Sequence, residues 1–366
     1  MNRRRFTSTA LATLGSAALG APLTRAFAAA DAPPPVPVTS AAPAPAWAPA
    51  ERYPDPAIDV LDPAFESIRL VDASIERLYV GSRWGEGPVW CGDQRALIWS
   101  DTPNDRLLRW DEITGTTADY RKPANRPTGG TRDRQGRLIT CENASRSVTR
   151  TEHDGTITTV IDRFDGKRLN SPNDVVVHSD GAIWFTDPTF GITNPYDGRV
   201  ARQEQPTHVY RVDPASGAAR IVIDAIRNPN GICFSPDETQ LYVSENGINP
   251  RVIWRYDVVD GGRQLSNKRL FLDCGEGTVD GFRVDTAGNL WCGWGMGRPD
   301  LDGVRVFSPQ GRLIGRIRLP ERCANLTFGG ADRNRLFMAA GHALFALYVN
   351  AQGVAAREAR HLGENT

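Results

Sequence analysis

Histidine and cysteine are scarce in this sequence, and neither is arranged as a metal site. The 366 residues include 5 His and 6 Cys. The cysteines, at positions 91, 141, 233, 274, 292 and 323, form no C-x-x-C pair, and the histidines do not cluster. Zinc ligation of the usual spacing is therefore excluded. Most of the cysteines stand in apolar strand patterns such as "GICF", so we expect buried thiols, although an oxidising compartment would permit disulfides.

Long helical periodicities and an excess of charge are also missing. Lys and Arg together number 43, as do Asp and Glu, so the formal net charge is zero. This balance suggests neither nucleic acid nor an anionic membrane as a partner. The 35 Gly, 26 Pro and 9 Trp favour a turn-rich all-β chain, and 40% hydrophobic residues can bury a substantial core.

The first thirty residues are predicted to be an export signal. "RRRFT" at residues 3–7 precedes an uncharged run rich in Ala, Leu and Gly, and "AFAAA" at residues 26–30 supplies small residues for cleavage. The paired arginines resemble a twin-arginine signal, which predicts a periplasmic or secreted bacterial protein. A transmembrane anchor is the alternative, but the apolar run is short and is broken by Gly and Pro. Cleavage would remove four Arg and no acid, leaving the chain net negative.

A linker and one large domain are predicted to follow the signal. Residues 31–50 are rich in Pro and Ala and have little to bury, which is typical of a tether. Residues 51–366 are then predicted to form a single domain.

A hairpin unit recurs six times in this predicted domain. Each copy has one polar residue, a short strand, a turn rich in Asp, Gly or Asn, and a second strand. The copies begin 42 to 57 residues apart, which leaves room for two further strands in each. They read "EGPVWCGDQRALIWSD" from Glu86, "TGGTRDRQGRLITCE" from Thr128, "NDVVVHSDGAIWFTD" from Asn173, "NGICFSPDETQLYVSE" from Asn230, "DGFRVDTAGNLWCGW" from Asp280 and "NLTFGGADRNRLFMAA" from Asn325.

Four strands per copy, six times over, predict an all-β fold: a six-bladed β-propeller with four-stranded antiparallel blades. A β-sandwich is the alternative, but it does not need six copies of one motif. The strand-like residues 66–82 have no hairpin of their own. We therefore expect them to complete the last blade beside residues 343–350 and close the ring.

The first residue of every copy carries a side-chain oxygen. The first strand of a blade lines the central axis, so these opening residues point to one end of the channel, here called the mouth. A buried ring of oxygens is costly unless a cation satisfies it. Carboxylates and amides without imidazole or thiolate suit a hard cation, calcium first, with magnesium, manganese or zinc less suited. The predicted ligands of one divalent cation are Glu86, Asn173, Asn230 and Asp280, which leave positions open for water or substrate.

The second strand of each copy runs back toward the mouth. Asn173 and Asp187 are therefore expected to be neighbours there, although Asn and Asp are also ordinary turn formers. Asp174 points the opposite way on an extended strand and is expected to orient a ligand from behind. The same reasoning brings the other second-strand ends to the mouth, namely Asp101, Glu142, Glu245, Trp294 and Ala340.

Four motifs on this repeat carry a family resemblance. "EGPVW" at Glu86, "SPNDVVV" around Asn173, "PNGICFSPD" around Asn230 and "VDGFRVDTAGNLW" around Asp280 are similar to motifs of the gluconolactonase, senescence marker protein (regucalcin) and luciferin-regenerating enzyme family. The likeness covers residues from about 75 to 350. The metal-site pattern more distantly resembles diisopropylfluorophosphatase and the paraoxonases.

The resemblance implies a six-bladed propeller that holds one divalent cation, most often calcium, and hydrolyses a lactone or related ester. By motif, the four predicted ligands correspond to the ligands of the family. One departure is notable: the animal members place an arginine two residues before the substrate-binding asparagine, and this chain has Ser171 there. Sugar recognition by that arginine cannot be carried over.

The expected chemistry is metal-assisted opening of a lactone ring. The cation polarises the carbonyl while a carboxylate at the mouth takes a proton from the attacking water. Asp187 is the first choice for this base and Asp280 the alternative. The polar residues 188–208 are expected to form a partial lid. Further residues are expected to contact substrate: Asp101, Glu142, Asn143, Glu245, Asn246, Trp294 and Arg298.

Two other functions stay open from the sequence. An enzyme with the same metal site could act on aryl esters or organophosphates, which relative rates on gluconolactone and a phosphotriester would distinguish. A non-catalytic propeller could bind a ligand through the mouth, but it would need neither open metal positions nor a spare carboxylate. The expected partner is a small-molecule lactone, and the oligomeric state is left open.

Overall fold

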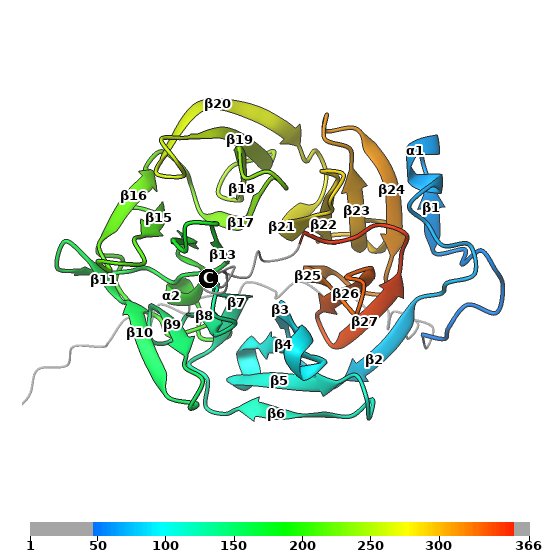
Figure 1. Cartoon of the computed structure of the whole chain (residues 1–366), viewed down its shortest axis with the longest axis horizontal. Coiled ribbons are helices and arrows are strands. Elements are labelled where there is room, and N and C mark those ends of the chain that lie inside the picture. The colour runs from blue at the N-terminus through cyan, green and yellow to red at the C-terminus, as the bar shows by residue number, and fades with distance from the viewer. Residues whose placement is uncertain (1–46, 355–366) are drawn as a thin grey trace, which may run out of the picture. The chain divides into compact units, whose positions relative to one another are not determined.

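The computed structural model describes residues 47–354, which form six antiparallel blades around a central channel (Figure 1). Five blades have four strands and one has five, which confirms the predicted six-bladed β-propeller. The predicted export signal, most of the predicted linker and residues 355–366 lie outside the described part. Within it, no helix is both long and apolar enough to cross a membrane.

The strands follow one another outward from the channel in each blade. Blades one to three consist of β3 (Gly85–Cys91), β4 (Ala96–Asp101), β5 (Arg106–Asp111) and β6 (Thr117–Arg121); β7 (Pro127–Arg132), β8 (Leu138–Glu142), β9 (Ser147–Thr151) and β10 (Ile157–Ile161); and β13 (Val175–Val177), β14 (Ile183–Asp187), β15 (His208–Val212) and β16 (Ala219–Ile223). Blades four and five consist of β17 (Pro229–Phe234), β18 (Gln240–Glu245), β19 (Val252–Val259) and β20 (Gln264–Asp273); and β21 (Thr278–Val284), β22 (Leu290–Gly295), β23 (Gly303–Phe307) and β24 (Leu313–Arg318).

The sixth blade joins the two ends of the described chain. Its inner strands are β25 (Cys323–Gly329), β26 (Arg335–Ala340) and β27 (Ala343–Tyr348). The outer strand is β2 (Glu76–Val80), which pairs antiparallel with β27. This pairing confirms the predicted ring closure.

Blade five carries a fifth strand that the sequence did not predict. β1 (Ile58–Val60) pairs with β24, and the short helix α1 (Pro63–Glu66) follows it. Phe65 of α1 is buried, and a Cβ on Gly315 would lie 2.5 Å from its ring. The absence of a side chain at Gly315 therefore admits the phenylalanine ring against the blade.

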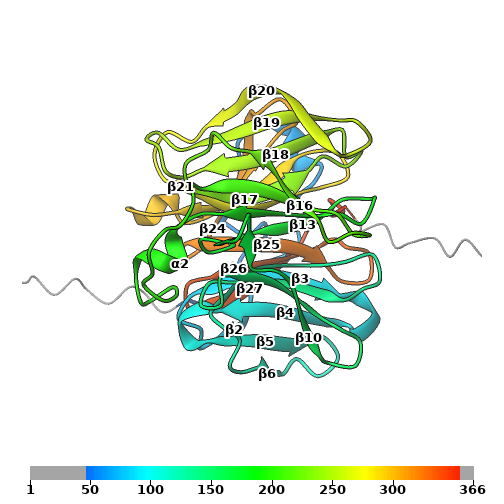
Figure 2. The same cartoon turned by 90° about the vertical axis from the view of Figure 1, so that its left-hand side faces the viewer.

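Short connections complete the fold. They comprise the β11–β12 hairpin (Arg163–Phe164 and Lys167–Arg168), the helix α2 (Phe190–Thr193), and the 3-10 turns Gly92–Gln94, Thr102–Asn104 and Pro299–Leu301. In the side view, α2 projects from one face of the ring (Figure 2).

Large side chains fill the spaces between neighbouring blades. Trp90 of blade one stacks on Phe337 of blade six with ring centroids 5.5 Å apart. Trp47, inside the predicted linker, packs edge-on against Phe345 at 5.8 Å, so contacts with the propeller already begin there. All six cysteines are buried and free, which confirms their interpretation as small core residues.

Candidate functional site

In five of the six blades, the inner strand is irregular near its opening residue. Glu86 of β3 pairs with Ser100 of β4, and the next pair is Val89 with Ile98. Three residue steps along β3 thus lie opposite two along β4. β7, β17 and β21 show the same shift, and β25 shifts by one residue between Cys323 and Asn325. Such bulges re-aim a side chain out of the regular alternation of a strand.

Glycine follows the opening residue in four blades and brings neighbouring inner strands together. A Cβ on Gly129 would lie 2.4 Å from the Asn173 carbonyl oxygen, and one on Gly231 would lie 2.3 Å from that of Asp280. A Cβ on Gly281 would be 2.1 Å from the Asn325 side chain. These approaches are too close for any other residue. The bulges and glycines thus gather the opening residues around the mouth.

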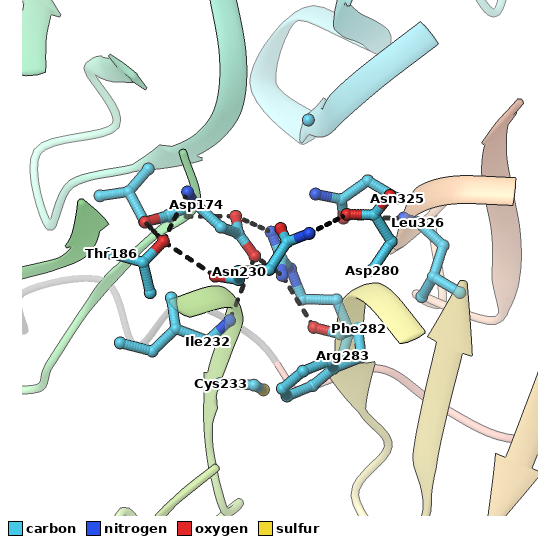
Figure 3. Close-up of polar contacts among 12 residues, drawn as sticks. Asp174, Thr186, Asn230, Ile232, Cys233, Asp280, Phe282, Arg283, Asn325 and Leu326 are labelled. Atoms are coloured by element: carbon cyan, nitrogen blue, oxygen red, sulfur yellow. Dashed lines mark hydrogen bonds and ion pairs between the residues drawn. The ribbon is translucent and has the colours of Figure 1, made fainter. Parts of the chain in front are cut away.

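Several opening residues are in direct contact across blades (Figure 3). The Asn230 amide nitrogen donates to Asp280 Oδ1 at 2.7 Å. The Asn325 amide nitrogen donates to Glu86 Oε2 at 3.3 Å. Arg322, immediately before β25, forms an ion pair with Asp280 Oδ2. The two predicted carboxylate ligands are thus held by groups from other blades.

Both carboxylates are nearly inaccessible, at 5% exposure for Glu86 and 4% for Asp280. Burial raises the pKa of the Glu86 carboxyl well above its usual range, and the charge of Asp280 raises it further. Burial also raises the pKa of Asp280, against the lowering effect of Arg322 and Asn230. Burial therefore disfavours the ionised form of both carboxyls.

A buried ion pair lies beside these groups. Both terminal nitrogens of Arg283 donate to Asp174, at 3.2 and 3.4 Å, and the backbone N–H of Ile232 adds a contact at 3.4 Å (Figure 3). The negative charge of Asp174 also raises the pKa of Glu86 and of Asp280. The charge of Asp174 thus disfavours the ionised form of both predicted carboxylate ligands.

Arg283 also lines a cavity of about 980 Å³ that is formed by the far ends of the inner strands. Other residues of this cavity are Val89, Val177, Phe234, Val284 and Phe328. No opening residue lines it. This cavity and the mouth are therefore distinct regions of the channel.

The side-chain chemistry at the mouth fits a hard cation. Asn173 is partly exposed, its backbone is fixed by bonds to Thr186 and Gly129, and its amide makes no hydrogen bond to another described residue. No three His, Cys, Asp or Glu side chains within residues 47–354 are grouped as metal ligands. The predicted set contains only two such residues, because its other two members are amides. Two buried carboxylates and two amides are a donor set that calcium accepts.

Four carboxylates at the ends of second strands share a different role: each holds the segment that precedes the inner strand of its own blade. Asp101 accepts from the Arg83 N–H at 2.9 Å, Glu142 from the Asn125 amide at 2.9 Å, Asp187 from the Asn170 N–H at 2.8 Å and Glu245 from the Arg227 N–H at 2.8 Å. In every case the held residue stands three positions before the opening residue. We call these four the loop-holding carboxylates, since their geometry positions the opening residues.

Like Asp101, Asp187 is fully enclosed. It has 0% exposure, and its second oxygen accepts from the Ser171 N–H at 2.8 Å. Burial raises its pKa to about 7, while the two backbone N–H groups lower it. Water could reach this carboxylate only if residues 170–171 moved. Its use as general base therefore stays a prediction that the geometry does not favour.

The remaining residues predicted to contact substrate lie in varied surroundings. Asn246 donates to the Val279 carbonyl at 2.9 Å and so supports the strand that carries Asp280. Trp294 is 1% exposed, and its ring is taken up by core packing beneath Arg305. Arg298 lies on the surface and pairs with Glu276 and Asp300.

The predicted lid forms hydrogen bonds with three blades. Ser171 of blade three donates to the Pro188 carbonyl at 2.7 Å and accepts from the Gly191 N–H at 3.0 Å. Asn143 of blade two donates to the Asp197 carbonyl at 3.0 Å. The Tyr196 hydroxyl reaches the Arg83 carbonyl of blade one at 3.2 Å. Ser171 thus fastens the predicted lid.

The inner-strand motifs also identify the family. The model of the SMP-30/gluconolactonase/LRE-like region matches residues 84–342, which include all six opening residues. The chain belongs to this family.

Similar members of the family include enzymes and a solved structure. A structure titled as a gluconolactonase from Xanthomonas campestris is 38% identical, has a TM-score of 0.74, and covers 82% of this chain and 96% of its own. A gluconolactonase of Zymomonas mobilis is 29% identical over 78% of this chain and 84% of its own length. A pentonolactonase of Haloferax volcanii is 28% identical over 74% and 83%.

Two features of the pocket had no individual prediction from the sequence. The partner of Asp174 was not foreseen, and neither was Arg322 beside Asp280. A signal for Arg322 exists in the repeat, because it stands three positions before Asn325. It therefore corresponds to the residues that the loop-holding carboxylates bind in other blades.

Proposed function

We propose that this protein hydrolyses sugar lactones at the mouth of the propeller. Lactonases of this family share up to 38% identity with it over most of its length. The observation that carries the proposal is the gathering of Glu86, Asn230 and Asp280 from three blades into one buried pocket, with Asn173 on a fourth. The substrate would be a small neutral ring ester.

Glu86, Asn173, Asn230 and Asp280 would hold one divalent cation, with calcium better suited than magnesium, manganese or zinc. When bound, such a cation polarises the lactone carbonyl and stabilises the negative charge that develops on its oxygen. The two carboxylates balance the charge of a dication.

Asp280 is the better placed of the two predicted bases. Its side chain stands among the opening residues, whereas Asp187 is enclosed by its own loop. The attacking water gives a proton to Asp280 as its oxygen bonds to the carbonyl carbon. The ring C–O bond then breaks, and the departing alkoxide takes the proton back. The product is an open hydroxy acid.

The lid supplies the wall that faces the substrate. Its contacts with Ser171, Asn143 and Arg83 anchor residues 188–197 from blade three to blade one. A lid fixed in this way limits the entry of water and of bulky substrates. We expect small aldonolactones to be turned over faster than large aryl esters.

A panel assay tests the proposed function. The purified protein is treated with chelator, and its rates on gluconolactone, a pentonolactone, an aryl acetate and a phosphotriester are measured before and after Ca²⁺, Mg²⁺, Mn²⁺ or Zn²⁺ is restored. We expect sugar-lactone hydrolysis that the chelator abolishes and calcium restores. Faster turnover of the aryl or phosphotriester substrate would change the substrate class. No turnover of any of the four substrates would indicate a non-catalytic binding protein.

We also propose that the protein works in the periplasm or outside the cell after twin-arginine export. The support is the sequence of residues 1–30 alone. Replacement of Arg3, Arg4 and Arg5 by Lys should retain the full-length chain in the cytoplasm of a bacterial host, as cell fractionation would show. Unchanged export would refute the proposal.

A further inference from the structure

Arg322 departs from the rule that the loop-holding carboxylates define. In blades one to four, the residue three positions before the opening residue is bound by a carboxylate at the end of the second strand. In blade six the corresponding residue is Arg322, and the second strand ends at Ala340. Alanine has no group with which to hold the segment. The second strand of blade six therefore supplies no carboxylate at this position. The bonds to Arg83 and Arg227 engage only their backbone N–H groups, so the direction of the Arg322 side chain is set by its own contacts.

The Arg322 side chain turns into the pocket. It forms an ion pair with Asp280 Oδ2, and its guanidinium lies 5.4 Å from the ring centre of Trp84, two residues before Glu86. The side chain is 12% exposed, and its Nε has no hydrogen-bond partner within the described chain. Arg83 and Arg227, at the same repeat position, are exposed instead. Arg322 thus links the segments that carry both carboxylate ligands.

Each oxygen of Asp280 already accepts one hydrogen bond in this arrangement. Asn230 occupies Oδ1 and Arg322 occupies Oδ2. A dication bound to Asp280 would have to share this carboxylate with a guanidinium of like charge. Two effects of Arg322 therefore oppose each other: its hydrogen bond orients the carboxylate, and its charge repels the cation.

The other buried guanidinium near the pocket does not share this position. Arg283 is engaged by Asp174 and by the Phe282 carbonyl. Its positive charge is paired with Asp174, which is not one of the four predicted cation ligands. Removal of the Arg322 charge would therefore leave Asp280 without its own counter-charge.

We propose that Arg322 is a positioning residue of the ion pocket that orients Asp280 for its role in hydrolysis and lowers the affinity of the pocket for a dication. This inference rests on the proposed function. It predicts that loss of the guanidinium tightens cation binding while it weakens catalysis. A residue that merely stabilises the fold would weaken both.

Calorimetric titration of the chelator-treated protein with Ca²⁺, together with gluconolactone kinetics, tests the inference. We expect Arg322→Gln to bind Ca²⁺ about tenfold or more tightly and to lose about tenfold to a hundredfold in kcat. Arg322→Lys keeps the charge but not the fork of donors. It should bind Ca²⁺ within about threefold of the wild type and still lose kcat. The matched control is Arg227→Gln, which changes an exposed side chain at the same repeat position and should alter neither quantity.

The outcomes separate the two proposals. A wild-type protein that binds no dication and opens no lactone overturns both. A wild type that does both, beside an Arg322→Gln variant with unchanged or weaker Ca²⁺ binding, overturns only the inference on Arg322. If Arg322→Gln does not fold, as its unfolding temperature without metal would show, Arg322→Lys decides, since unchanged kcat in that variant refutes the orienting role.

Discussion

Asp187→Asn distinguishes a positioning carboxylate from a general base. Asp187 accepts two backbone N–H bonds, both at 2.8 Å, with no exposed surface. Asparagine has the same shape, but one of its ends is an NH2 group that cannot accept a hydrogen bond. One buried N–H of residues 170–171 is then left without a partner. An unsatisfied buried group of this kind costs about 1–3 kcal/mol.

This cost should appear in both stability and activity. For a domain of 150–250 residues, 1 kcal/mol corresponds to about 2–4 °C in Tm, and a larger propeller should shift by the lower figure or less per kcal/mol. Displacement of residues 170–171 also moves Asn173, so kcat should fall together with Ca²⁺ affinity. Thermal unfolding, calorimetric titration and gluconolactone kinetics on the same preparation measure all three quantities.

Glu245→Gln is the matched control, because Glu245 holds the Arg227 N–H before Asn230 in the same way. If Asp187 positions a ligand, the two variants should behave alike. If Asp187 is the general base, its asparagine variant should lose about a hundredfold to ten-thousandfold in turnover with unchanged Tm and Ca²⁺ affinity. That second result would refute the positioning role.

Three further predictions follow from the same site. Glu86→Gln should lower Ca²⁺ affinity by about tenfold or more without lowering Tm in chelator, since it removes a buried charge; a stable variant with wild-type affinity would exclude Glu86 as a ligand. Burial raises the pKa of Asp187 to about 7, above the value of about 3.9 in an unfolded chain. The stability linked to this proton is therefore complete below about pH 4 and lost as pH rises through 7, and denaturant titrations should show a steeper decline over this range in the wild type than in Asp187→Asn. Tyr196→Phe removes the bond to the Arg83 carbonyl and should raise KM severalfold with little change in Tm, whereas an unchanged KM would show that this end of the lid does not shape the site.

The repeat made the fold predictable. Six hairpins that each begin with an oxygen-bearing side chain fix both the number of blades and the end of the channel at which these residues gather. The pairing of β2 with β27 could also be inferred, because an unmatched strand and an incomplete blade need each other. β1 was missed because three residues carry little periodicity, and its docking depends on the absence of a side chain at Gly315.

The site was harder to predict for a physical reason. Sequence shows which residues end a strand, but not which hydrogen bonds their side chains make. Asp187 was therefore expected to face water, while its carboxylate turns back onto the N–H groups of residues 170–171. Arg322 stands at the position of the held residues in other blades, but its second strand ends at Ala340, which has no carboxylate. Only a comparison of all six blades reveals this difference.

The closure of the ring also bears on when the chain can fold relative to its synthesis and export. Glu76 and Ala346 pair in the sixth blade, so the ring cannot close until β27 has left the ribosome. Threading through a narrow translocon during synthesis would keep these partners apart. The proposed twin-arginine export, which accepts folded proteins, would instead let the last blade close before the chain crosses the membrane.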